Sequence, residues 1–176
     1  MKVPTTSSIV YQDEAPATVS EAARSALAGL AKGWSGGEGS VHPHQDQYPG
    51  VLVDRADYAK AAEALRSQAQ FITYIDNTAV DYPDRKPARF TVVTVLLNMA
   101  TQERLLLKAH VAEGESIPTL THLWKAADWA ERETFDMFGV PFDGHPDLTR
   151  IYMPQDYDGY PMRKDFPLQG HLRFQD

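Results

Sequence analysis

The chain contains no cysteine among its 176 residues. This absence excludes disulfide bonds, a thiolate nucleophile and iron–sulfur clusters held by cysteine ligands. Basic residues are also few, with 17 Lys and Arg against 24 Asp and Glu, which gives a net charge of −7. Nucleic-acid phosphates attract basic surfaces, so this acidic balance argues against a nucleic-acid partner.

Long hydrophobic runs are missing as well. The longest apolar stretch, at 92–97, has the length of a strand, whereas a membrane-spanning helix needs about 20 apolar residues. The N-terminus is acidic and has no apolar core, so it is typical of neither a secretory signal nor an Arg-rich transit peptide. We therefore expect a cytosol-facing protein without a membrane span.

The order of apolar residues, helix caps and turn residues divides the chain into three parts. Residues 1–17 are expected to be a flexible leader, 18–139 an α+β domain and 140–176 an extended partner-binding tail. Within the domain we predict a helix at 20–32 capped by Ser20, strands at 51–53 and 71–75 around a helix at 57–66, strands at 89–98 and 104–111, and a helix at 119–137 ending at Gly139.

The first strand–helix–strand unit is expected to form a right-handed parallel crossover. The short polar link at 100–103 favours an antiparallel hairpin between the two strands that it joins. The predicted fold is α+β, a βαβββα-type mixed sheet covered by helices and followed by an extended C-terminal strap.

The strap at 140–176 cannot be helical, because prolines at 141, 146, 154, 161 and 167 fix the backbone and remove donors. It is nevertheless rich in large apolar side chains, which disordered segments lack. Such a segment needs apolar surface to lie against, and one small domain has little to spare. We therefore expect a partner protein to order it.

Charged residues on the last predicted helix allow two interpretations. Asp128, Arg132 and Asp136 recur at every fourth position, a pattern that usually forms a solvated face worth a few tenths of a kcal/mol. Because an aromatic strap follows, we favour a partly buried interface, in which the Arg geometry matters more.

Metal binding and catalysis receive little support from the spacing of the candidate groups. Glu131, Glu133, Asp136 and His145 carry ligand atoms, but Glu131 and Glu133 point to different helix faces and no E-x-x-H pair is present. His145 follows Gly144 in a G-H-P turn, where it either bonds backbone or fixes a corner that aims the strap. The histidines at 42 and 44 fit a solvated loop better than a ligand pair. We predict no catalytic, cofactor-binding or metal-ligating residue.

Two segments resemble a known family. The wording E-R-E-x-x-D-M-F-G, G-H-P-D-L-x-R-I and G-x-P-x-R-K-D-F-P-L at 131–168, with T-A-V-D-Y-P at 78–83 and R-F at 89–90, resembles the 30 kDa (C-type) component of NADH:quinone oxidoreductase, respiratory complex I. Related branches act in ferredoxin:quinone complexes and in membrane-bound hydrogenases. A carboxylate-dependent metalloenzyme and a generic adaptor are alternatives of another class.

The resemblance implies a cofactor-free structural subunit on the cytoplasmic side of the bacterial inner membrane. In that family FMN and iron–sulfur clusters belong to partner subunits, and the chain packs on the large, hydrogenase-like quinone-site subunit of 49 kDa type and on adjacent iron–sulfur subunits. The enzyme activity belongs to the assembly. The expected interface residues are Asp128, Glu131, Arg132, Glu133, Asp136, Gly144, His145, Arg150, Tyr157, Tyr160, Arg163, Lys164, Asp165 and Phe166.

Overall fold

The computed structural model describes residues 11–36 and 48–167, so the first part of the leader, His42, His44 and the end of the strap lie outside the described residues. A five-stranded sheet has the order β1-β2-β5-β4-β3, and β6 and β7 form a second, two-stranded sheet. The elements are α1 (Glu21–Ala26), β1 (Ala31–Ser35), β2 (Gly50–Val53), the 3-10 helix η1 (Arg55–Asp57), α2 (Tyr58–Gln68), β3 (Thr73–Asp81), β4 (Phe90–Asn98), β5 (Glu103–Val111), β6 (Ile117–Pro118), α3 (Ala127–Phe138) and β7 (Phe142–Asp143). Within these ranges no helix has both the length and the apolar character needed to cross a membrane.

The main sheet is mixed, which confirms the α+β prediction. β4 pairs antiparallel with β5 and with β3, so the predicted hairpin is confirmed. β2 pairs parallel with β5 and antiparallel with β1. These pairings give β2 and β3 the same direction, but β5 and β4 lie between them. The crossover through α2 therefore spans two strands, because the later hairpin fills the space between its ends.

The N-terminal helix was predicted too long. Ser20 caps it as expected, accepting the Ala23 N–H at 3.3 Å, but α1 ends at Ala26 and Gly29 follows with φ +78°. A positive φ suits glycine and ends a helix. Residues 31–35 then extend as β1, where pairing with β2 buries the Trp34 side chain.

The last helix was also predicted too long, since the α-helix expected from Thr119 begins at Ala127. Thr119 instead bonds β7, where its backbone N–H donates to the Asp143 carbonyl oxygen at 2.9 Å.

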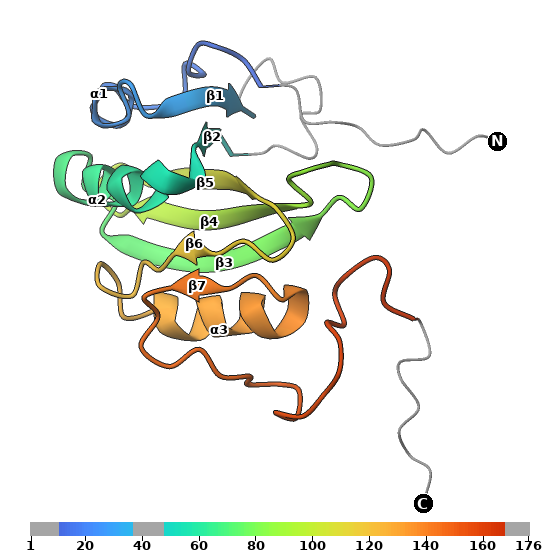
Figure 1. Ribbon diagram of the computed structural model, residues 1–176. Helices are drawn as coiled ribbons and strands as arrows, with labels where there is room; N and C mark the ends of the chain where they lie inside the picture. The colour runs from blue at the N-terminus through green and yellow to red at the C-terminus, as the bar shows by residue number, and fades with distance from the viewer. Residues whose placement is uncertain (1–10, 37–47, 168–176) are drawn as a thin grey trace, which may run out of the picture.

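One face of the main sheet carries the core. Alternate residues of β5, from Leu105 to Val111, are fully buried, as the two-residue period of a strand requires. Helices α1, α2 and α3 contribute Ala23, Leu65 and Ala127 to the same buried cluster. Figure 1 shows α3 lying beside β3, with the strap in orange and red passing along the helix before it turns away.

A buried chain of polar side chains joins three parts of this core. The Tyr58 hydroxyl of α2 bonds the Thr94 hydroxyl of β4, which also accepts the Asn77 amide of β3 at 2.8 Å. Thr134 of α3 donates to the Asn77 side-chain oxygen at 2.7 Å. All four side chains are buried, so each polar atom in the chain needs these neighbours.

Candidate functional site

The strap lies on its own domain through residue 167, although the sequence suggested that a partner would have to supply its surface. The contacts that hold it are mainly hydrogen bonds and ion pairs rather than apolar packing. This explains the difference, because polar anchors do not require the large apolar surface that the domain lacks. The strap contains no described helix or strand after β7.

Asp136 is the first anchor. One carboxylate oxygen, Oδ2, accepts the backbone N–H groups of Ile151, Tyr152 and Met153 at 3.0, 2.7 and 2.9 Å. The other accepts the Arg150 guanidinium at 2.8 Å. Burial acts to raise the pKa of Asp136, but these donors outweigh it and hold the pKa below that of an ordinary carboxyl. The carboxylate therefore stays charged and fixes one turn of the strap.

Arg89 and Asp81 form the second anchor, at the start of β4 and the end of β3. Arg89 donates to both Asp81 oxygens, at 2.8 and 2.9 Å, and its guanidinium also meets Asp165 of the strap at 2.8 Å. Asp81 accepts the Lys164 backbone N–H at 2.8 Å. Burial acts to raise the pKa of Asp81, but Arg89 and the Lys164 amide lower it below its usual value. Sequence reasoning matched Asp81 and Arg89 to the family wording without assigning them this role.

Arg163 forms the third anchor, next to the end of α3. Its guanidinium donates to the Phe138 carbonyl at 2.6 Å and to Glu113 at 2.7 Å, and lies 4.3 Å from the centre of the Tyr160 ring. Gly139 ends the helix with φ +73°, as predicted from the sequence. A Cβ at this position would lie 2.5 Å from the Tyr160 ring and 2.7 Å from Arg163, so the strap sits directly on the glycine.

Asp128, Arg132 and Asp136 of α3 each bond the strap. Arg132 bonds the Thr149 carbonyl at 3.0 Å and the Thr149 hydroxyl at 2.7 Å. It faces the strap, as Asp136 does, while Asp128 meets the corner of the strap at His145. His145 Nδ1 accepts the Asp147 N–H at 3.1 Å, which places the proton on Nε2 for donation to the Asp128 carbonyl at 3.1 Å. The G-H-P segment is thus a turn held by backbone contacts.

Glu131 belongs to the interior of the domain. Its side chain is fully buried and accepts the Thr119 hydroxyl at 2.5 Å and the Leu120 N–H at 2.7 Å. Burial raises its pKa from 4.5 to about 7, although both hydrogen bonds act to lower it. An acid with a raised folded-state pKa stabilises the fold below its unfolded pKa, and this contribution is lost as pH rises through the folded pKa.

Glu131→Gln is therefore expected to flatten one part of the pH dependence of stability. Between about pH 5 and 8 the wild-type chain should lose up to about 3 kcal/mol relative to the variant, because only the wild type acquires a buried charge. Urea unfolding across this range measures the difference. The exposed neighbour provides a control, since Glu133→Gln should keep the wild-type profile; parallel profiles for Glu131→Gln would show that Glu131 does not titrate there.

The remaining candidates are spread along the strap. The Tyr157 and Phe166 rings lie 6.4 Å apart, and Gly144 is exposed with φ +81°. Glu133 is exposed on α3 and accepts the Tyr152 hydroxyl at 3.5 Å. Of the residues in 11–36 and 48–167, no three His, Asp or Glu side chains gather as a metal site would require. Glu131 and Asp136 each hold other parts of the chain, so they do not converge with Glu133.

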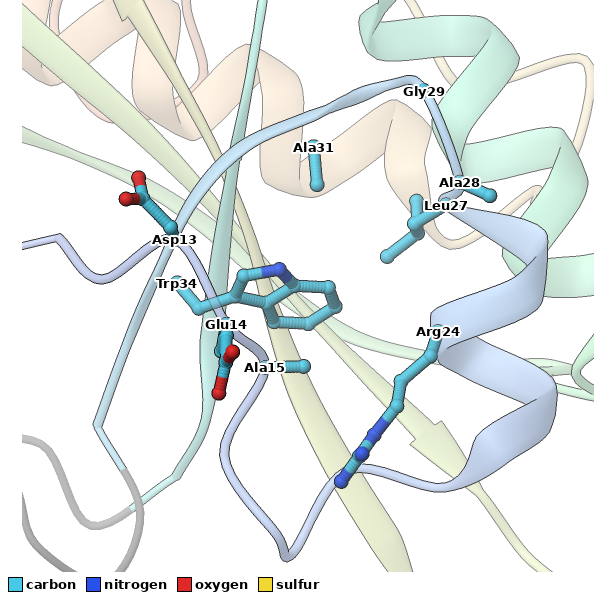
Figure 2. A pocket seen from close by; sticks show the side chains of 9 residues that line it. All are labelled: Asp13, Glu14, Ala15, Arg24, Leu27, Ala28, Gly29, Ala31 and Trp34. Atoms are coloured by element: carbon cyan, nitrogen blue, oxygen red, sulfur yellow. The ribbon is translucent and has the colours of Figure 1, made fainter.

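A hollow of about 420 Å³ opens beside β1, which the sequence did not predict (Figure 2). Its lining includes Trp34, Leu27 and the carboxylates of Asp13 and Glu14. The Arg24 guanidinium at its edge donates to the Val19 and Pro16 carbonyls at 3.0 and 2.9 Å, so this cation fixes the chain before α1. The hollow shares no residue with the three strap anchors.

Comparison with known proteins gives consistent matches. Residues 51–172 match the model of the respiratory-chain NADH dehydrogenase 30 kDa subunit. The C-type subunit of the NADH-quinone oxidoreductase of Ruegeria pomeroyi is 44% identical over 126 residues, covering 72% of this chain and 60% of the relative. The combined C/D subunit of the Sulfurihydrogenibium enzyme is 48% identical over 134 residues, covering 73% of this chain and 23% of the relative.

A solved trypsin-resistant fragment of Nqo5 has the same fold. It is 29% identical, with a TM-score of 0.58, and the match covers 71% of this chain and 95% of the fragment. The chain spans about 60% of the length of the Ruegeria relative. Because the family match covers more than half of the sequence, this chain belongs to the 30 kDa subunit family of respiratory-chain NADH dehydrogenase.

Proposed function

We propose that the chain is a cofactor-free structural subunit in the peripheral arm of a proton-pumping NADH:quinone oxidoreductase. In this proposal it docks on the large quinone-site subunit, at the cytoplasmic face of the bacterial inner membrane, and keeps the electron-transfer subunits in fixed geometry. FMN and iron–sulfur clusters belong to its partners. The family match over 51–172 is the observation that carries the proposal.

Two further features support it. Cysteine is absent from the whole sequence, so the chain has no thiolate ligands for an iron–sulfur cluster. The name of the Sulfurihydrogenibium relative joins C and D, and the region that matches this chain covers 23% of the relative. A C region joined to a D region in one polypeptide favours direct contact between the corresponding subunits, and we take the D-type subunit as the quinone-site partner.

The test is purification of the tagged chain from detergent-solubilised membranes of its own host. We expect the large quinone-site subunit and the iron–sulfur subunits to co-purify, and the assembly to reduce quinone with NADH. The purified chain alone should be colourless and free of stoichiometric metal. An assembly that accepts electrons only from ferredoxin would place it in the related branch, and one tightly bound metal per free chain would contradict a cofactor-free role.

A further inference from the structure

The outer surface of α3 and the strap combines large exposed apolar side chains with hidden cations. Trp129 and Tyr152 are each 65% exposed and Met162 is 57% exposed. All three residues belong to α3 or contact it. Trp129 lies on α3, with its ring 4.9 Å from the Arg132 guanidinium. The Tyr152 hydroxyl contacts Glu133 of α3, and the Met162 N–H donates to the Met137 carbonyl of α3 at 3.1 Å. We call the surface formed by Trp129, Glu133, Tyr152 and Met162 the α3 ridge.

On this part of the molecule the arginine side chains are mostly buried, whereas the aspartate side chains are exposed. The guanidiniums of Arg132, Arg150 and Arg163 are turned inward, with side chains only 14, 10 and 14% exposed. The carboxylates of Asp147 and Asp165 are 63 and 60% exposed. Asp156 and Asp158 are also exposed, and Lys164 is the exposed lysine among them. The exposed charged side chains of the described strap are therefore mainly acidic, and we call these four aspartates the acidic rim.

This arrangement has the composition of a protein-binding hot spot. Trp and Tyr dominate such sites because each buries a large area with few rotatable bonds, while a polar rim excludes water around them. An acidic rim selects a basic partner surface and speeds its approach. Asp136 adds a second reason, because it fixes the backbone of Tyr152 and so presents that ring in a defined position.

We propose that the α3 ridge is the surface that docks on the large quinone-site subunit, with Trp129 and Tyr152 as anchors in apolar pockets surrounded by basic residues. This inference rests on the proposed function and specifies where and how the contact is made. Trp129 was not among the residues expected from the sequence, where a lone exposed tryptophan on a charged helix gives no signal of its own.

The test measures binding of the tagged full-length chain to detergent-solubilised complex from a strain that lacks the chain. Trp129→Ala and Tyr152→Ala should each weaken binding about 30-fold, the effect of losing a typical hot-spot anchor. Met99→Ala is the matched control, because Met99 is 53% exposed at the β4–β5 turn, and it should bind like wild type. Thermal unfolding confirms that the variants fold.

Charge gives an independent arm. The double variant Asp156→Lys, Asp158→Lys should slow association at low salt, and the difference from wild type should shrink as salt screens the rim. Wild-type binding of both alanine variants, or association unaffected by the charge reversal, would overturn the ridge as the docking surface. Failure of the wild-type chain itself to bind the complex would instead contradict the proposed function.

Discussion

Replacing Asp136 by alanine should lower the free energy of unfolding by about 3–5 kcal/mol and release residues 150–153 from α3. The change leaves three backbone donors without their acceptor and removes the ion-pair partner of the Arg150 guanidinium, and a buried ion pair that loses one member costs this much. Urea unfolding gives the energy, and hydrogen exchange at the amides of 151–153 reports the strap directly.

Glu133→Ala is the control for this experiment. Glu133 lies on the same helix but is exposed, with one long contact to Tyr152 at 3.5 Å. Its loss should change stability by less than about 0.5 kcal/mol. Amides at 151–153 that exchange at the wild-type rate in Asp136→Ala would mean that other contacts hold the strap.

Gly139→Ala is the second large effect, expected at about 2–5 kcal/mol. The left-handed backbone there costs a non-glycine residue about 1–2 kcal/mol, and forcing a methyl group against Tyr160 and Arg163 adds about 1–3 kcal/mol. Gly114→Ala separates the two causes, because Gly114 also has positive φ, +81°, but nothing lies within 4 Å of its Cβ position.

The comparison is made by urea unfolding of both variants and by hydrogen exchange at 160–163. Only Gly139→Ala should speed exchange in the strap, since only there does the new methyl group displace it. Equal losses of stability in the two variants, with an unchanged strap, would show that Tyr160 and Arg163 yield without cost.

Periodic features of the fold could be predicted from the sequence. The strands at 90–98 and 103–111 and their hairpin follow from two short apolar runs and the short polar link between them, and the end of α3 follows from Gly139. β1 could not be predicted in this way, because A-K-G-W-S has no strand pattern and depends on pairing with β2.

The contacts of the strap anchors could not be predicted from a sequence pattern either. Asp136 acts on backbone N–H groups, which every non-proline residue has, so its partners are invisible in the sequence. Asp81 and Lys164 meet across 83 residues, a separation set by the sheet and not by local spacing. The family wording marked both segments, and the structure supplies the physical reason why they contact each other.

The polar chain from Tyr58 through Thr94 and Asn77 to Thr134 selects one alignment of β3 against β4. Val92, Val93 and Val95 are interchangeable in size and polarity, so apolar packing of β4 alone distinguishes poorly between the native pairing and a shifted one. A slip by one residue would turn Asn77 to the opposite face of the sheet, so the buried side chains of Thr94 and Thr134 would each lose a hydrogen-bond partner. Four hydrogen-bonding side chains thus reject misaligned strand pairings that the valines alone would accept.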